Sequence, residues 1–301
     1  PADAWAVQAA ARIITANAGD GGETEDGPVW VRSALTTLVQ AAVRWPHIAT
    51  TQLAPLLTEH PRLALSAGSA TLTALAGIDA LDVTVLEAIE AVLPEGSHVE
   101  LDAGIAALSQ RLTAHRLPTA DPAQRARIHQ TLAVRLSLAG WRDDALAEGR
   151  QAVEMWRQLV TANRAVHLPS LAASLINCAR LLAEVGRRNE ALSVSEEAVE
   201  LHRELVTTNR AAYLLGYTQS VVVLGYVLVQ DARFGEAVTP LAEALVAGQE
   251  LPEYARGIVG VIIDLLRLCR AEDAAGTDAA FRSATGQDTP DWMKQPPTAE
   301  G

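Results

Sequence analysis

The chain has 301 residues, of which 49% are hydrophobic and only 4% aromatic, and its formal net charge is −12. This length and apolar content are enough for one large or two ordinary domains. Because the negative charge repels a phosphate backbone, we expect no nucleic-acid partner.

The sequence gives no signal for secretion or for a membrane. No basic segment precedes an apolar stretch at the N-terminus, and the longest apolar run, residues 221–229, is far too short to span a bilayer. Cys178 and Cys269 lie in apolar helical contexts, which indicates buried thiols in a reducing compartment. We therefore expect a cytoplasmic protein with no membrane partner. The chain begins at Pro1 without a methionine, which suggests a piece of a longer protein.

Residues 1–117 are expected to form an N-terminal helical module. An amphipathic helix is predicted over residues 2–18, followed by a glycine-rich loop whose acidic side chains disfavour a phosphate cradle. Apolar residues at helical spacing then predict helices over residues 29–44, 47–59, 61–76, 79–93 and 100–116. Residues 1–120 carry 13 acidic and 6 basic side chains, so this module is the acidic part of the chain. Degenerate helical hairpins and a separate helical module both fit, and we favour the hairpins.

One pattern of residues then recurs three times at an interval of 46, in the segments Ala139–Leu146, Val185–Leu192 and Asp231–Val238. Ala145, Ala191 and Ala237 occupy equivalent positions in it. Before each segment, apolar residues recur three and four apart, which is helical spacing. Each unit is therefore predicted to be a helix, a tight turn of glycine or other small residues, and a second helix. One such pair cannot bury its apolar stripe alone, so neighbouring units are expected to stack.

This arrangement resembles the tetratricopeptide repeat (TPR) family, in which small residues stand where the two helices cross. In the second unit the matching residues are Leu175, Cys178, Ala179, Leu182, Gly186, Ala191, Ser195 and Ala198. At the crossing, the first unit offers Ala133 and Gly149, and the third offers Gly225 and Leu241. The interval of 46 exceeds the usual 34, and Asn163 and Asn209 replace the family's frequent final proline. The repeats are similar to the extended repeats of actinobacterial and kinesin-light-chain-like proteins, over roughly 130 of the 301 residues.

The resemblance implies an all-α fold, a right-handed α-α superhelix (TPR-like solenoid) with an N-terminal helical module. Three repeats are expected within residues 122–250, at about 125–170, 171–216 and 217–251. A capping helix is expected within 252–271, over Tyr254 to Arg270, with Asp264, Arg267 and Arg270 toward solvent. Residues 272–301 lose periodicity and are expected to be an irregular tail. Trp292–Met293 either docks as an anchor or belongs to a loose tail, and we favour the loose tail.

No combination of residues indicates catalysis, so neither an enzyme nor a cofactor or metal site is expected. The seven histidines lack the i, i+4 pairing of a helical zinc site. His98-Val99-Glu100 matches half of a zinc deaminase signature, but no Pro-Cys-x-x-Cys follows. The segment Ser66–Ala70 lacks the first glycine of a nucleophile elbow, and its small residues are expected to let two helices approach. Cys178 has no activating neighbour in sequence. An acidic patch is expected to be a solvated outer face, and it comprises Glu196, Glu197, Glu200 and Glu204.

In TPR proteins the first helix of each repeat lines a concave groove that holds an extended peptide or a partner helix, and the resemblance implies the same here. The matching residues are Arg127, Gln130 and Val134 in the first unit, Ala173, Asn177, Arg180 and Glu184 in the second, and Gln219, Val222 and Tyr226 in the third. Amides can pair with a bound backbone, and Arg127 and Arg180 can clamp a carboxylate. The alternative for each side chain is that it packs against a neighbouring unit.

The sequence therefore favours a protein-interaction scaffold or sensor module that binds a protein or peptide through its groove residues. We expect it to be part of a larger bacterial signalling or defence-type protein. The alternative is a self-association module, in which exposed apolar faces stack the chains into a homo-oligomer. An enzyme with a site in the N-terminal helices has no supporting residues.

Overall fold

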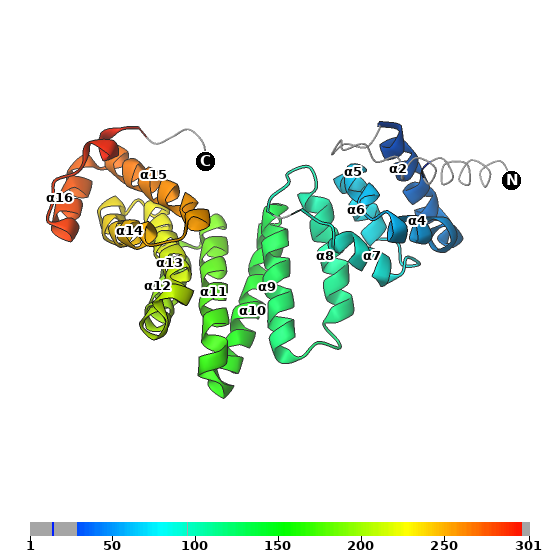
Figure 1. Cartoon of the computed structure of the whole chain (residues 1–301), viewed down its shortest axis with the longest axis horizontal. Helices are drawn as coiled ribbons and strands as arrows, with labels where there is room; N and C mark the ends of the chain where they lie inside the picture. The colour runs from blue at the N-terminus through cyan, green and yellow to red at the C-terminus, as the bar shows by residue number, and fades with distance from the viewer. Residues whose placement is uncertain (1–13, 15–28, 95, 297–301) are drawn as a thin grey trace. The chain divides into compact units, whose positions relative to one another are not determined.

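The computed structural model describes residue 14, residues 29–94 and residues 96–296, and all regular elements in these ranges are helical (Figure 1). The all-α prediction is confirmed for this part of the chain. The helix predicted over 2–18 and the glycine-rich loop lie outside the described residues, except Ile14, which is buried. The chain forms two compact units, one ending at Ala145 and the other beginning at Leu146. The predicted division at residues 117–122 stays a prediction.

The first unit contains α2 (Val29–Arg44), α3 (Pro46–Ile48), the π-helical η1 (Ala49–Leu53), α4 (Ala54–Glu59), α5 (Leu63–Ser66), α6 (Ser69–Ala76), α7 (Val83–Glu90), α8 (Asp102–Arg116) and α9 (Pro122–Leu138). The helix predicted over 61–76 is divided, because Gly68 has a φ of 84° that a right-handed helix excludes. The helix predicted over 79–93 begins later. Its N-cap is Asp82, whose carboxylate accepts a hydrogen bond from the Thr84 N–H at 2.9 Å.

Helices α6 and α8 approach each other closely at Gly104. The Gly104 N–H donates to Ser69 Oγ at 2.7 Å, and a Cβ on Gly104 would lie 2.6 Å from the Ser69 carbonyl oxygen. Only glycine fits there, because a methyl group at that distance overlaps the backbone of α6. The prediction that small residues of the segment Ser66–Ala70 let two helices approach is therefore confirmed.

Arg111 of α8 satisfies the backbone at the end of α6. Its guanidinium donates to four carbonyl oxygens at 2.7–3.3 Å, those of Ala76, Ile78, Asp79 and Leu81. The last carbonyls of a helix and those of the following loop have no partner within the helix. Arg111 therefore supplies hydrogen bonds that the irregular stretch between α6 and α7 cannot make by itself.

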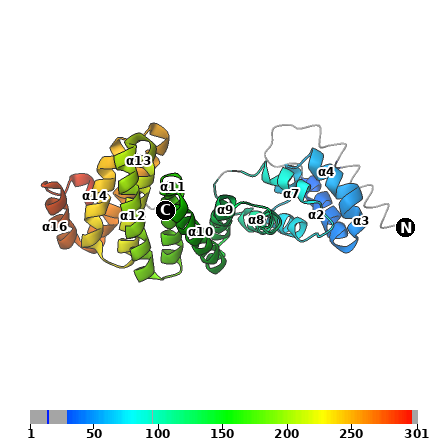
Figure 2. The same ribbon diagram turned by 90° about the horizontal axis from the view of Figure 1, so that it is seen from below.

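The second unit begins within α10 (Arg142–Ala162), which follows α9 through the turn at Gly140. It contains α11 (Arg164–Glu184), α12 (Arg188–Thr208), α13 (Arg210–Gln230), α14 (Phe234–Gln249), η2 (Glu253–Ala255), α15 (Gly257–Glu272), α16 (Ala274–Thr285) and η3 (Asp291–Lys294). From α11 to α14 each helix packs against the next, and α11 also contacts α13 (Figure 2). Stacked helical hairpins of this kind form a solenoid.

The three turns between paired helices repeat one backbone geometry. Gly140, Gly186 and Ala232 have positive φ values of 78°, 76° and 56°. The residue after each turn donates its N–H to the carbonyl five residues earlier at 2.9 Å, in the pairs Trp141 to Leu136, Arg187 to Leu182 and Arg233 to Leu228. This is the Schellman motif of a helix C-terminus. Ala145, Ala191 and Ala237 all follow at the same distance and are 0% exposed, so their predicted equivalence is confirmed.

At the helix crossing of the third repeat, the small residue is on α13 and the large residue is on α14. Leu241 stands where the other repeats have Gly149 and Ser195, and it is fully buried. A Cβ on Gly225 would lie 2.6 Å from Leu241 Cδ2. The larger side chain on α14 therefore occupies the room that the missing methyl group on α13 leaves.

The irregular tail predicted over residues 272–301 is wrong for residues 274–285, which form α16. Asp273 caps this helix by accepting a hydrogen bond from the Gly276 N–H at 2.9 Å. Gly286, with a φ of 70°, ends it in the left-handed conformation. Phe281 is buried in the core shared with α14 and α15. Tertiary contact and end caps thus stabilise a helix that contains one large apolar residue, Phe281.

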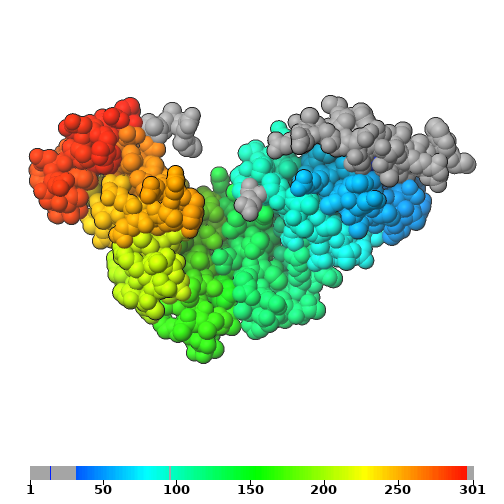
Figure 3. Space-filling view, viewed as in Figure 1, coloured from blue at the N-terminus to red at the C-terminus, as the bar shows by residue number. Residues whose placement is uncertain are grey.

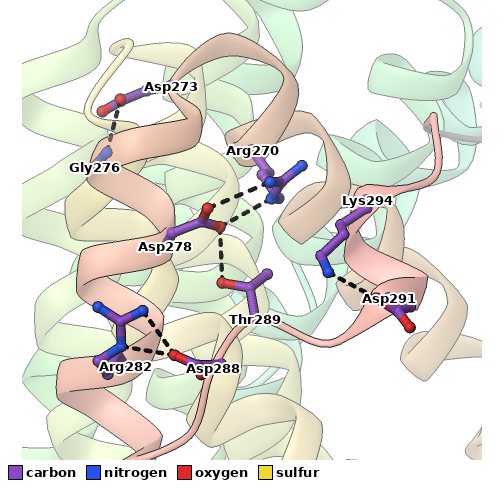
Figure 4. Close-up of polar contacts among 9 residues, drawn as sticks. All are labelled: Arg270, Asp273, Gly276, Asp278, Arg282, Asp288, Thr289, Asp291 and Lys294. Carbon is purple, nitrogen blue, oxygen red and sulfur yellow. Dashed lines mark hydrogen bonds and ion pairs between the residues drawn. The ribbon is translucent and has the colours of Figure 1, made fainter.

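Helix α15 packs against α14, as expected of the predicted capping helix (Figure 3). The expectation that its charged residues face solvent is wrong, because α16 and η3 lie over them. Arg270 pairs with Asp278 of α16 at 2.9 Å, and the Thr289 hydroxyl donates to the same carboxylate at 2.7 Å (Figure 4). Arg267 pairs with Asp264 at 3.3 Å. These contacts join α15, α16 and the segment that follows.

The segment around Trp292 docks on α15. Arg267 donates to the Trp292 carbonyl oxygen at 3.0 Å. Met293 is 1% exposed and lies in the same core as Leu266 and Phe281. The favoured expectation of a loose tail is therefore wrong here, and the anchor alternative is right.

Candidate functional site

The predicted groove residues lie on the first helix of each repeat, which are α9, α11 and α13. The α9 residues belong to the first unit. Arg127 is exposed there and lines a hollow of about 360 Å³ together with Arg116 and Gln124. Gln130 and Val134 are half-buried. Arg127 thus remains open to a ligand, as the carboxylate clamp requires.

In the second unit, α11 and α13 pack against each other. Gln219 is exposed, and Asn177 and Tyr226 are half-buried. Within the described ranges, the side chains of these three residues make no hydrogen bond to protein. The 46-residue repeat places Ala173 at the position equivalent to Gln219, and Arg180 at the position equivalent to Tyr226. Two amides and a phenol with free hydrogen-bonding capacity therefore stand on neighbouring helices.

The remaining groove residues are engaged within the fold. Val222 is 8% exposed and belongs to the core around α13 and α14. Arg180 pairs with Glu184, one turn later on α11. A carboxylate bound to Arg180 has to compete with Glu184 for the guanidinium. The assignment of all ten residues to a binding groove stays a prediction.

Both cysteines are buried, as predicted. Cys178 is 3% exposed and Cys269 is fully buried. Burial raises the pKa of the Cys178 thiol, and it raises the pKa of the Cys269 thiol to about 11. Both thiols are therefore protonated at neutral pH, which is the opposite of what a nucleophilic cysteine needs.

The segment that resembles half of a deaminase signature lies just before helix α8, which begins at Asp102. The Asp102 carboxylate accepts hydrogen bonds from the Ser97 hydroxyl at 2.9 Å and from the His98 backbone N–H at 3.0 Å. Val99 is 90% exposed. In the part of the chain that the structure describes, no group of three or more His, Cys, Asp or Glu side chains is placed to hold a metal ion. His98 and its neighbours thus shape a helix start.

By length and composition, α11 and α13 are both apolar enough to cross a membrane. Half of the apolar window of each is buried inside the structure. The run 221–229 is too short by itself, but the criterion is met when the whole helix is considered. Core helices of repeat proteins meet it too, because neighbours cover more than one of their faces.

A set of Arg–Glu pairs, which we call the Arg–Glu ladder, links the helices of the second unit. The two members of each pair are 40 residues apart. The pairs are Arg150–Glu190, Arg157–Glu197 and Arg164–Glu204, each at 2.6 Å, with Arg203–Glu243 at 3.9 Å and Arg210–Glu250 at 2.7 Å. The sequence interpretation missed this ladder, although the constant separation of 40 was a readable signal. Each pair is solvent-exposed, so each contributes little to the stability of the fold.

The ladder also explains the two asparagines that replace proline. Asn163 and Asn209 cap α11 and α13, accepting hydrogen bonds from the N–H groups of Val166 and Ala212. The arginine that follows each asparagine pairs with the glutamate 40 residues later, Arg164 with Glu204 and Arg210 with Glu250. Arg164 holds the pKa of Glu204 below its usual value, mainly through its hydrogen bonds to that carboxylate.

Three carboxylates of the predicted acidic patch are therefore in ion pairs. Glu197 and Glu204 are members of the ladder, and Glu200 pairs with Arg203 on its own helix. Their side chains are 37%, 69% and 49% exposed for Glu197, Glu200 and Glu204, in keeping with the expected solvated outer face. Glu196 is exposed and has no ion-pair partner among the described residues.

Comparison of the sequence with models of known protein families gives no match, and comparison with curated proteins gives none either. Among solved structures, the chain is similar to a crystal structure of kinesin light chain-type, nearly identical TPR-like repeats from Podosopora anserina. The TM-score is 0.42 and the sequence identity 17%, over 80% of this chain and 94% of that one. A single-substitution variant of the same protein gives the same values, with 93% of its chain covered. This likeness is too distant to support a statement on function. By its own contacts, the second unit is a solenoid of stacked helical hairpins.

Proposed function

We propose that the chain is a protein-interaction scaffold that binds an extended peptide or a partner segment along α11 and α13. The observation that carries this proposal is the packing of α11 against α13, with the free side chains of Asn177, Gln219 and Tyr226 on the two helices. An amide both donates and accepts hydrogen bonds, so it can pair with a peptide backbone of any sequence. The tyrosine adds a rigid amphipathic ring of the kind that anchors interfaces.

In the first unit, taken by itself, α9 offers a separate exposed arginine. Arg127 is exposed and beside a hollow, so it is available to a ligand carboxylate. A scaffold role is consistent with thiols that burial keeps protonated. The expectations of a larger bacterial signalling or defence-type protein, a cytoplasmic location and no membrane partner stay predictions.

The proposal is tested with peptides selected from a random displayed library against the full chain. We expect Tyr226→Ala and Gln219→Ala each to weaken binding of the selected peptides, by about tenfold or more for the tyrosine. The matched controls are Tyr254→Ala and Gln249→Ala, which remove the same side chains from exposed positions outside the α11–α13 face. Dissociation constants that rise equally in all four variants, or in none, would contradict the proposed face.

Self-association is the second candidate function, favoured by exposed apolar side chains near the C-terminal end of the second unit. Val246, Tyr254 and Val261 are 64%, 85% and 51% exposed. They belong to α14, η2 and α15, and exposed apolar side chains favour contact with another protein surface. We expect light scattering of the full chain to show mass that rises with concentration, and Val261→Glu to abolish the rise. A monomer at every concentration would rule this candidate out.

A further inference from the structure

A hollow of about 270 Å³ lies among α12, α13 and α14, away from the α11–α13 face of the proposed function. Its floor is apolar, with Val199, Val221 and Leu228 buried. Its rim is charged, and the rim residues are Glu196, Arg203, Arg233, Glu236 and Glu243. An apolar floor with a charged rim can hold a side chain that has both an apolar stem and a charged end.

The same positions in the preceding repeat interface, 46 residues earlier, carry nearly the same residues. The charged positions there are Arg150, Arg157, Arg187, Glu190 and Glu197. Arg150 pairs with Glu190 at 2.6 Å, and Arg187 pairs with the same carboxylate at 2.6 Å. The one difference in charge is that Glu196 replaces Arg150.

This replacement removes one pair of the Arg–Glu ladder. Glu236, the counterpart of Glu190, keeps its bond to Arg233 at 2.6 Å but has no arginine from α12. Glu196 has no ion pair among the described residues. The rim therefore holds three glutamates and two arginines, whereas the preceding interface holds two glutamates and three arginines. The hollow lies where the ladder lacks a guanidinium.

We propose that this hollow accepts the side chain of an arginine carried by a partner protein, and that its guanidinium takes the place that Arg150 fills one repeat earlier. Two carboxylates then flank the guanidinium, Glu196 and Glu236, and charge-assisted hydrogen bonds to carboxylates are the strong ones. The apolar floor packs the aliphatic stem of the arginine and an apolar neighbour in the partner. The partner segment is thus recognised as an arginine flanked by apolar residues.

The test uses blocked pentapeptides with a single central residue between leucines, which is arginine in the probe and glutamate in the control. Methyl NMR of the full chain follows the side chains of Val199 and Leu228. We expect the arginine peptide to shift these methyl signals and the glutamate peptide to leave them unchanged. Glu196→Arg supplies the missing cation from the chain itself, so it should weaken binding at least tenfold. Glu196→Gln, which keeps the shape, should weaken it severalfold.

The preceding interface offers a gain-of-function control. Arg150→Glu gives the matching positions one repeat earlier the same charges as the rim of the hollow, so it should create a second site for the arginine peptide. The new site is expected to shift the methyl signals of Val153 and Leu182. Equal shifts with both peptides, or unchanged binding in Glu196→Arg, would overturn the proposal. Shifts at Val199 and Leu228 that grow with protein concentration alone and vanish in Glu196→Arg would also overturn it, because the occupant is then a second copy. None of these variants changes the α11–α13 face, so the proposed function is tested separately.

Discussion

Gly225→Ala adds one methyl group where α13 crosses α14, and its effect can be worked out from the structure. The new Cβ would lie 2.6 Å from Leu241 Cδ2 and 2.7 Å from its Cγ. Leu241 is fully buried and has no room to move away. Overpacking of this kind costs about 1–3 kcal/mol, against which the helix preference of alanine over glycine returns about 1 kcal/mol. We therefore expect a net loss of up to about 2 kcal/mol.

Gly260→Ala is the matched control, because it makes the same chemical change inside α15 with no atom within 4 Å of the new Cβ. It should stabilise the fold by up to about 1 kcal/mol, through helix preference alone. Leu241→Ala should cost about 2–5 kcal/mol, since it opens a cavity. The double variant, Gly225→Ala with Leu241→Ala, partly fills that cavity. Its loss should be smaller than the sum of the single losses by about 0.5–3 kcal/mol.

Urea unfolding of the full chain, followed by circular dichroism, measures these four free energies. Amide hydrogen exchange of α13 and α14 locates the change in the third repeat. If Gly225→Ala stabilised the chain as much as Gly260→Ala, or if the two single effects simply added, the close crossing would not exist as described.

Three further predictions follow from single contacts. Ala232→Gly should stabilise the chain by about 1 kcal/mol in the same urea assay, because Ala232 has a φ of 56° where the other turns have glycine. Arg111→Gln should destabilise the first unit by about 1.5–3 kcal/mol, since its charged donors bond the carbonyls after α6; a loss no larger than that of Arg127→Gln would contradict this role. Burial lowers the pKa of His202 in the folded chain. Between this lowered pKa and the ordinary pKa of about 6.5, the unfolded chain therefore binds more protons than the folded chain. The stability that His202 contributes is therefore present above about pH 6.5 and lost as the pH falls through its folded pKa, and His202→Gln should flatten the dependence of stability on pH in urea titrations.

The repeat itself could be predicted because its signals are local. The backbone geometry of one hairpin requires glycine in the turn, at Gly140 and Gly186. It also requires a small residue five positions later. Helix α16 was missed because Phe281 is the one large apolar residue in it, although Asp273 and Gly286 mark its ends. The division at Gly68 was missed because a glycine inside a helical pattern does not by itself reveal a positive φ.

The candidate site could be predicted in part. The register identified α9, α11 and α13 as the first helices, but it did not separate open from buried positions on them. Ser220, Val221 and Val222 are consecutive and all buried, because α13 is covered by α11, α12 and α14. A helix covered on several sides has no single apolar stripe, so periodicity cannot select its free face. The Arg–Glu ladder was not predicted for a related reason. Its pairs join neighbouring helices, and only the packing shows which sides of these helices face each other.

Photo-crosslinking tests the proposed binding face most directly. A photoreactive phenylalanine derivative is placed at Gln219, which is exposed on α13, and in a second variant at Gln249, which is exposed at the end of α14. A peptide selected against the full chain is added to each variant, and the crosslinked product is measured by mass spectrometry. We expect the peptide to crosslink to position 219 and not to position 249. Crosslinking at 249 alone would contradict a scaffold that binds its partner along α11 and α13.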